Sequence, residues 1–131
     1  MEVNKALKGS LIIDDSYNAN PESMKKSLDV LKDLTDKKRI FVAGEMAELG
    51  KDQAYYHEKI CKYANGRVEE FLCIGGLWSE GLRYIPEIGK SFSSKEEILD
   101  YLNANISKDS VILVKGSRST GMDFIADELK V

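Results

Sequence analysis

The fold class follows from one stretch of sequence, Leu11–Leu34, which reads LIIDDSYNANPESMKKSLDVLKDL. It opens on three apolar residues, Leu11–Ile13, which indicate a buried strand. After a short polar segment, Asn20 is a suitable helix N-cap and Pro21 suits the first helical position. The apolar residues that follow recur at helical spacing: Met24, Leu28, Leu31 and Leu34. The stretch therefore predicts a strand, a polar turn and a helix over Pro21–Leu34.

The rest of the chain repeats this alternation of strand and helix. Apolar or β-branched runs predict further strands at Val3–Leu7, Arg39–Ala43, Glu70–Ile74 and Val111–Val114, with a weaker one at Lys90–Phe92. Amphipathic spacing predicts further helices at Asp52–Asn65, Ser94–Asn105 and Gly121–Leu129. Gly66 suits the end of the first of these helices, and Ser94 with Glu97 fits a capping box at the start of the second.

The order of these elements predicts the architecture. Strands that alternate with amphipathic helices form mostly parallel sheets that are covered on both faces. The first two strands are different, because the few residues Lys8–Ser10 are too short for a parallel crossover and predict an antiparallel hairpin. We therefore expect one α/β domain over residues 1–131. It would be a Rossmann-like three-layer domain, with a mostly parallel sheet of about six strands and an N-terminal antiparallel hairpin.

Composition and charge narrow the class of protein. The chain has 131 residues, 43% hydrophobic and 31% charged, which suits one folded domain with its own core. The 19 Lys and Arg against 22 Asp and Glu leave a net charge of −3, which gives no overall attraction to nucleic acid. No apolar run suits a membrane span or a signal peptide, so a cytoplasmic location is expected. Cys61 and Cys73 lie outside metal or redox spacing and are predicted to be core residues.

The polar residues that follow the strands are the candidates for a functional site, because ligands bind beyond the carboxyl ends of parallel strands. Four segments qualify: Asp14–Asn20, Gly44–Met46, Gly75–Gly76 and Lys115–Ser119. We expect all four to emerge at the same edge of the sheet.

The first and last of these segments carry opposite charges. The carboxylates of Asp14 and Asp15 can grip ribose hydroxyls or Mg²⁺, and the amides that follow suit a purine or an anion at a helix N-terminus. Lys115 and Arg118, with two serine hydroxyls, suit a carboxylate or a phosphate. The alternatives are a polar turn that only caps a helix and a solvated basic loop.

Several other sites are excluded or disfavoured by the sequence. Gly89–Ser91 resembles the end of a phosphate loop, but Tyr84 stands where such a loop has its first glycine. His57 is the only histidine, so a nucleophile triad or a histidine-rich metal site is implausible. It shares a predicted helix face with apolar residues, which favours packing over function. We predict no metal site in this chain.

Three motifs, taken together, resemble the C-terminal domains of Mur ligases. They are DDSYNANPESM at Asp14–Met24, GEMAELG at Gly44–Gly50 and VKGSRS at Val114–Ser119, with His57 between the last two. The motifs run in order through nearly the whole chain, and the run Tyr17–Asn20 favours the branch of the family that adds a dipeptide. The chain departs from the family pattern at three positions. Glu45 stands where the family often has aspartate, Cys61 where it often has glycine, and Gly121 where it often has arginine.

The resemblance implies an ATP-dependent ligase of peptidoglycan precursor synthesis. Such an enzyme joins D-alanyl-D-alanine to UDP-N-acetylmuramoyl-tripeptide through an acyl phosphate. It also implies that a uridine-binding N-terminal domain and a central ATPase domain, with the phosphate loop and most Mg²⁺ ligands, lie outside this chain. The chain would then bring the amine substrate and close over ATP, and alone it would be inactive.

The resemblance also implies roles for particular residues. On the ATP side it places Asp15, which would hold the ribose, together with Tyr17, Asn18 and Asn20. Toward the carboxylate of the incoming dipeptide it places Lys115, Ser117 and Arg118. Candidates of second rank near the domain interface are Asp14, Glu45, Met46 and His57.

Other classes fit part of the pattern. A phosphoacceptor receiver domain also has a parallel α/β plan with an acidic pair, here Asp14–Asp15, and a late lysine, here Lys115. It needs a phosphorylatable Asp at the end of its middle strand, where this chain has Ala43–Glu45, and a Ser or Thr near Gly75, where it has Gly76. Other Mur-type ligases and folylpolyglutamate synthase share the domain plan, and a nucleotide-binding module without a ligase partner stays open.

Overall fold

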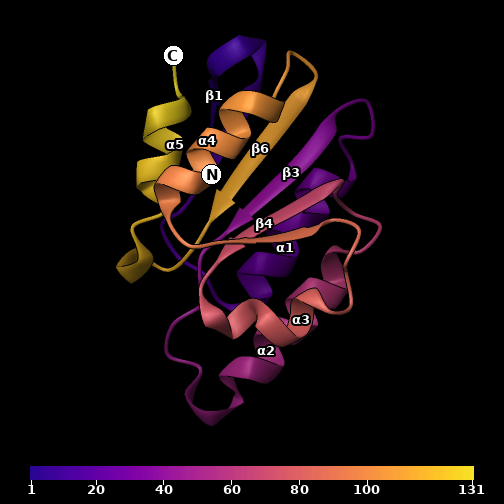
Figure 1. Ribbon diagram of the computed structural model, residues 1–131, viewed down its shortest axis with the longest axis vertical. Helices are drawn as coiled ribbons and strands as arrows, with labels where there is room; N and C mark the ends of the chain where they lie inside the picture. Colours follow the sequence, from indigo (N-terminus) through magenta and orange to yellow (C-terminus); the bar gives the residue numbers. More distant parts are fainter.

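Six strands form one sheet between two layers of helices in the computed structural model, which describes residues 1–131 (Figure 1). The strands are β1 (Glu2–Lys5), β2 (Leu11–Asp15), β3 (Lys38–Ala43), β4 (Glu70–Ile74), β5 (Gly89–Phe92) and β6 (Ser110–Lys115). The α-helices are α1 (Pro21–Lys32), α2 (Gln53–Ala64), α3 (Ser79–Leu82), α4 (Lys95–Asn105) and α5 (Asp123–Leu129). None of these helices has the length and apolar character needed to cross a bilayer.

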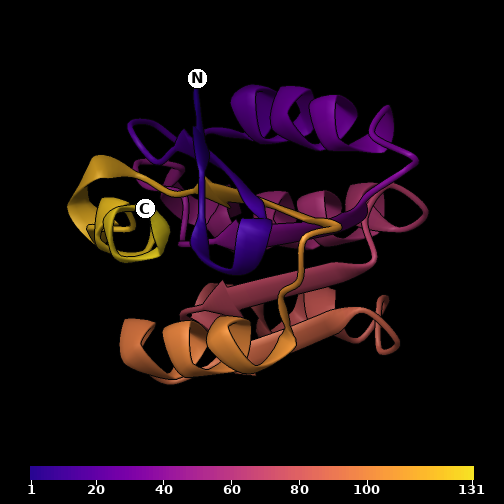
Figure 2. The same ribbon diagram turned by 90° about the horizontal axis from the view of Figure 1, so that it is seen from above.

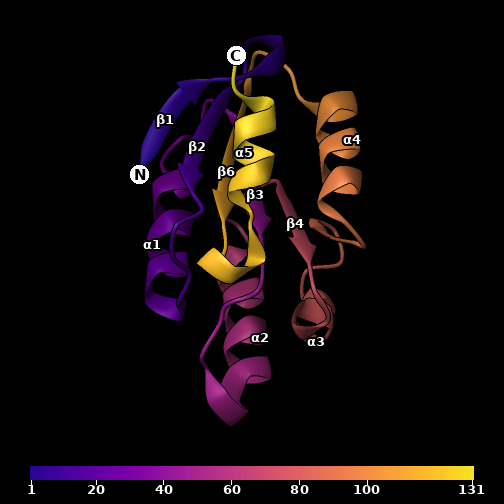
Figure 3. The ribbon, with the colours of Figure 1, turned by 90° about the vertical axis from the view of Figure 1, so that its left-hand side faces the viewer.

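The strand order in the sheet is β1-β2-β6-β3-β4-β5. β1 pairs with β2 in the antiparallel sense at one edge, as Figure 3 shows, and every other pair is parallel. The predicted fold class, including the N-terminal hairpin, is confirmed. β6 lies between β2 and β3, so the loops that follow these three strands leave the sheet side by side.

Each face of the sheet has its own apolar core, because successive side chains of a strand point to opposite faces. On one face Phe41 and Phe71 pack among residues of α1 and α2. On the other face Ile40 and Val42 pack among residues of α4 and α5. Figure 2 shows α1 and α4 on opposite sides of the sheet. Both cysteines are fully buried in the first core, which raises the pKa of each thiol to about 12 and confirms that they are packing residues.

The start of α1 is held by the cap that the sequence predicts, while the cap of α4 is only half of the predicted motif. The side-chain oxygen of Asn20 accepts from the Ser23 N–H at 2.8 Å, and the Asn20 N–H donates to the Ser23 hydroxyl at 3.0 Å. At α4 the Ser94 hydroxyl accepts from the Glu97 N–H at 3.1 Å. The Glu97 carboxylate, however, accepts from Ser93 and not from Ser94, so the reciprocal contact of a capping box is absent.

The bounds of several elements differ from the predicted ones for local reasons. β2 and β6 continue to Asp15 and Lys115, which lie side by side in the ladder although both are polar. The first strand ends early because a turn with positive φ at Lys8 and Gly9 follows it. The last helix begins at Asp123, since Gly121 is left-handed with φ of 64° and ends a 3₁₀ turn. The short helix α3 was not predicted, and Gly66 has the expected positive φ.

Replacing Asn20 by alanine should lower the free energy of unfolding by about 1 kcal/mol, because it removes the side-chain acceptor of the α1 cap. Asn20→Asp should keep most of the stability, since a carboxylate can accept the same hydrogen bond. Urea unfolding followed by circular dichroism measures both. Asn18→Ala, in the same loop but outside the cap, is the control, and an equal loss in that variant would contradict the assignment.

Candidate functional site

The four polar segments that follow β2, β3, β4 and β6 all lie at one edge of the sheet, as predicted, because these strands run parallel. Backbone hydrogen bonds join two of the segments directly. The Gly44 N–H donates to the carbonyl of Lys115 at 2.8 Å, and the Ser117 N–H donates to the carbonyl of Glu45 at 3.4 Å. The loops after β3 and β6 therefore form one connected surface.

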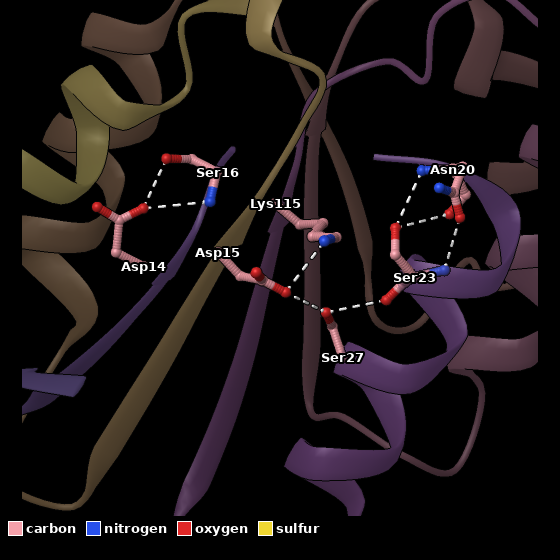
Figure 4. Close-up of polar contacts among 7 residues, drawn as sticks. All are labelled: Asp14, Asp15, Ser16, Asn20, Ser23, Ser27 and Lys115. Atoms are coloured by element: carbon pink, nitrogen blue, oxygen red, sulfur yellow. Dashed lines mark hydrogen bonds and ion pairs between the residues drawn. The ribbon is translucent and has the colours of Figure 1, made fainter. Parts of the chain in front are cut away.

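An ion pair joins the last residues of β2 and β6. The ammonium of Lys115 lies 3.0 Å from Oδ2 of Asp15, and the Ser27 hydroxyl donates to the same oxygen at 2.8 Å (Figure 4). The Lys115 side chain is 3% exposed and the Asp15 side chain 21%. Ser27 lies on α1, so the contact also connects this helix to the sheet. The carboxylate of Asp15 is thus held by two donors on one oxygen, while Oδ1 has no partner.

The neighbouring carboxylate, Asp14, points away from this pair, as expected for successive residues of a strand. It accepts from the Ser16 hydroxyl at 2.6 Å (Figure 4) and pairs with Lys130 at 3.3 Å. Burial acts to raise the pKa of Asp14, but the hydrogen bonds from Ser16 and Lys130 outweigh it and the pKa is lowered. Asp14 and Asp15 therefore hold separate contacts and do not form one acidic pair.

A buried histidine fixes the loop that follows β3. The Met46 N–H donates to Nε2 of His57 at 3.0 Å, and Nδ1 of His57 donates to the carbonyl of Gln53 at 2.7 Å. The ring lies edge-on to Trp78, with 4.4 Å between ring centroids. Burial lowers the pKa of His57, so the neutral ring is favoured. His57 thus contacts the candidate site through the backbone of Met46.

Glu45 connects the same loop to the segment after β4. Its carboxylate accepts from the Leu77 N–H at 2.8 Å. Its side chain occupies the space that a Cβ at Gly75 would need, and Gly75 itself has φ of 113°, which a residue with a side chain rarely adopts. Glycine is therefore required at position 75 on two counts. The contact fixes the Glu45 side chain within this chain.

A polar cleft of about 260 Å³ opens between the loops after β2, β3 and β6. Eight residues line it: Tyr17, Asn18, Ala19, Ala47, Glu48, Ser117, Arg118 and Ser119. The guanidinium of Arg118 lies over the Tyr17 ring, 5.0 Å from its centroid. The cleft combines hydroxyls, an amide, one cation and one anion, a set that suits a small polar ligand.

The structure brings some predicted site residues together and separates others. Tyr17 and Asn18, expected on the ATP side, line the same cleft as Ser117 and Arg118, expected on the dipeptide side. Asp15 lies beside it in a second hollow of about 400 Å³ that also contains Asp14 and Tyr17. Lys115 lies under Asp15, and the remaining candidates are held by contacts within the chain: Asn20, Glu45, Met46 and His57.

Sequence reasoning did not single out two residues that the structure places at the site, Ser27 and Glu48. Ser27 had a signal, because it is a polar residue within the buried stripe of α1, three positions after Met24. Glu48 had no signal beyond its place in the GEMAELG motif. Its backbone is left-handed, with φ of 60°, and a glutamate does not predict that conformation. Ser119 lies in the predicted loop, and its hydroxyl is 3.0 Å from that of Ser117.

Several carboxylates line the second hollow. No group of three or more His, Cys, Asp or Glu side chains in the chain is arranged to hold a metal ion. Lys130 lies among the acidic residues of the second hollow, and its ammonium is within 3.5 Å of the carboxylates of Glu2, Asp14 and Asp127. Lys130 therefore offsets part of the negative charge there.

Comparison with known families identifies the domain. The family described as "Mur ligase, glutamate ligase domain" matches residues 1–118. This chain belongs to the Mur ligase family. The match includes the loops after β2, β3 and β4 in full and extends through Arg118, so nearly all of the cleft lies within the Mur ligase domain. The receiver class, which the acidic pair and late lysine also allowed, is excluded by this result.

Curated relatives and solved structures narrow the position within the Mur ligase family. UDP-N-acetylmuramoyl-tripeptide--D-alanyl-D-alanine ligase of Buchnera aphidicola subsp. Acyrthosiphon pisum is 39% identical over 122 residues, which are 91% of this chain and 26% of that protein. MurF from Acinetobacter baumannii superimposes with a TM-score of 0.84 at 29% identity, over 98% of this chain and 29% of that one. MurF from Thermotoga maritima, solved in complex with ADP, superimposes with a TM-score of 0.80 at 26% identity. The match covers 96% of this chain and 29% of that one.

The Mur ligase domain described here is therefore similar to one part of longer enzymes. It spans about a quarter to a third of the length of these relatives, between 26% and 29%. The two MurF structures share with this chain the sheet, its antiparallel edge and the flanking helices.

Asp15→Asn should destabilise the chain by about 2 kcal/mol, because it leaves the buried ammonium of Lys115 without a counter-charge. The value is below that of a fully buried pair since Asp15 is partly exposed. The double variant Asp15→Asn, Lys115→Met should regain about 1 kcal/mol or more. Asp29→Asn, which breaks the exposed pair with Arg67, is the control and should cost less than about 0.5 kcal/mol. Equal losses in urea unfolding for Asp15→Asn and Asp29→Asn would contradict the role of the pair.

Stability should fall as the pH drops below about 6.5, where unfolded His57 gains a proton that the folded chain resists. Because the folded pKa is lowered, the unfolded state binds more protons in this window, and stability rises with pH until His57 is neutral in both states. The loss amounts to about 1.4 kcal/mol for each unit by which the folded pKa is depressed.

Urea midpoints measured between about pH 4 and pH 7.5 test this dependence, and the contribution of His57 is read between about pH 5.5 and pH 7.5. In His57→Gln the slope across this window should disappear, whereas a slope below pH 5 should persist because Asp14 and Glu69 also have lowered pKa values. An unchanged slope in His57→Gln would assign the dependence to other groups.

Proposed function

We propose that this chain is the C-terminal domain of a cytoplasmic ligase that uses ATP to add D-alanyl-D-alanine to UDP-N-acetylmuramoyl-tripeptide. The observation that carries the proposal is the cleft in which the loops after β2, β3 and β6 meet, in a chain that belongs to the Mur ligase family. The relatives named for this reaction match 91–98% of the chain, and the chain matches 26–30% of their length. In the proposed enzyme, the N-terminal and central domains account for the remainder.

On the nucleotide side, Asp15 is the residue proposed to bind the ribose. Its Oδ2 is occupied by Lys115 and Ser27, so Oδ1 stays free to accept from a hydroxyl. Tyr17 is 73% exposed and can lie against a flat or polar group of the nucleotide. The side-chain oxygen of Asn20 is used by the α1 cap, which leaves its amide N–H groups as donors. With Asn18, these residues form the proposed ATP contacts of this domain.

On the dipeptide side, Ser117 and Arg118 line the cleft and can bind a carboxylate. Arg118 is exposed and makes no ion pair within the chain, so both edges of its guanidinium are available. Lys115 is nearly buried and its ammonium is bound to Asp15, so in the proposed site it supports the carboxylate of Asp15 from below. Its charge also adds to the positive potential near the loop.

In the proposed reaction ATP supplies the phosphoryl group that activates the carboxylate of the tripeptide. In the proposed enzyme the Mg²⁺ ligands belong mainly to the other domains. The task of this chain is to bind the dipeptide, to place its amine against the activated carboxylate and to exclude water. Orientation of this kind is a large contribution to rate enhancement, and domain closure commonly provides it.

The proposal is tested by a chimera in which this chain replaces the C-terminal domain of MurF from Acinetobacter baumannii. The chimera should release phosphate from ATP in the presence of the UDP-linked tripeptide and D-alanyl-D-alanine, and not with D-glutamate as the amine. The chain alone should release none. Arg118→Gln in the chimera should raise the KM for the dipeptide about tenfold, by loss of a charge-assisted hydrogen bond.

Three results would contradict the proposal. One is phosphate release with D-glutamate and not with the dipeptide, which would favour another branch of the family. Another is turnover by the chain alone. The third is a folded chimera, as judged by circular dichroism, that is active with neither amine.

A further inference from the structure

The cleft holds one cation and one anion that no residue of the chain neutralises. Arg118 and Glu48 both line it, and neither takes part in any ion pair or side-chain hydrogen bond of the structure. Of the other charged groups nearby, Asp14 is paired with Lys130 and Asp15 with Lys115. Asp123 lines an adjoining hollow with Arg118 and makes no ion pair, but it does not line the cleft itself. An unpaired charge of each sign in one small cleft matches a ligand that carries both charges.

Glu48 belongs to a loop whose first residues are fixed. On one side the Met46 backbone is held by buried His57, and Glu45 is bound to the Leu77 N–H. Glu48 itself is left-handed with φ of 60°, a conformation that is unfavourable for a residue with a Cβ and that directs its side chain differently from an extended loop. The carboxylate is therefore presented at the cleft by a loop of defined conformation.

Arg118 is positioned from the other side. Its guanidinium lies over the Tyr17 ring at 5.0 Å, and Ser117 and Ser119 beside it have their hydroxyls 3.0 Å apart. The guanidinium makes no hydrogen bond within the chain, so its N–H groups are free for a carboxylate. The cation–ring contact brings the loop after β2 and the loop after β6 together at the cleft.

We propose that this cleft binds a small zwitterion, with Arg118 on its carboxylate and Glu48 on its ammonium group. The inference rests on the proposed function and deepens it, because the incoming dipeptide has these two charges, one at each end. Its amino end then lies toward the loop after β3 and its carboxyl end toward the loop after β6. The volume of about 260 Å³ is just below the range of clefts that hold drug-sized ligands, which suits a dipeptide of small residues.

The charge of Glu48 also argues against a nucleotide phosphate in the same cleft. A carboxylate close to Arg118 would repel a polyanion, and its repulsion would offset the attraction of the single cation. For a zwitterion, in contrast, both charges of the cleft are attractive. Glu48 is thus a residue that selects for a free amine.

The test uses amide NMR of the chain with three ligands: D-alanyl-D-alanine, its N-acetyl derivative and its C-terminal amide. The unmodified chain should bind the free dipeptide in the range of about 1 mM and each blocked form about fivefold to tenfold more weakly. Glu48→Gln should lose the preference for the free amine and keep that for the free carboxylate. Arg118→Gln should show the opposite pattern. Glu96→Gln, an exposed change on α4 outside the cleft, is the matched control and should behave as the unmodified chain.

Several outcomes would overturn the inference. One is the absence of saturable shifts at about 20 mM dipeptide, well above the affinity expected for two charge-assisted contacts. Others are an equal effect of Glu48→Gln on all three ligands, or tighter binding of ATP to Glu48→Gln with displacement of the dipeptide. The proposed function fails separately, through the amine selectivity of the chimera. If the chimera with Glu48→Gln has the same KM for D-alanyl-D-alanine as the chimera without this substitution, the role of Glu48 is refuted and the proposed function is not.

Discussion

The ion pair between Asp15 and Lys115 is the contact on which the functional edge depends. Asp15 is the last residue of β2 and Lys115 the last residue of the adjacent parallel strand β6. The loops that lead from these two strands into the cleft therefore begin directly after the ion pair. Removing both charges from water is costly, and the hydroxyl of Ser27 on α1 compensates part of that cost. One contact thereby joins the side chains at the ends of β2 and β6 to α1.

The loop after β3 is stabilised in a different way. It has no ion pair, but a neutral histidine accepts its backbone N–H, and Glu45 is bound to the segment after β4. Two glycines complete the arrangement, because a Cβ at Gly44 or Gly116 would lie 2.6 Å or 2.5 Å from Cγ of Met122. The residues that precede α5 can therefore pack directly on the ends of β3 and β6. Charge fixes one side of the cleft, and close packing fixes the other.

Local sequence patterns predicted most of the fold because each pattern had a local cause. Asn20 and Pro21 mark the start of α1, and the short Lys8–Ser10 connection requires a hairpin. The site was predicted as segments but not as contacts. The pairing of Asp15 with Lys115 depends on the crossover that places β6 beside β2, and the left-handed Glu48 depends on anchors far along the chain. Such features arise from tertiary structure, which spacing along one sequence does not encode.

The reversed direction of β1 has a mechanical consequence. Because β1 runs antiparallel to β2, its residue Glu2 lies beside Asp14, near the carboxyl end of β2. In a larger ligase, a domain joined ahead of β1 would have its pivot close to the cleft. Rotation about such a pivot moves nearby groups through short arcs and distant groups through long arcs. Large rotations of the domain would then be compatible with small displacements of the residues that line the cleft.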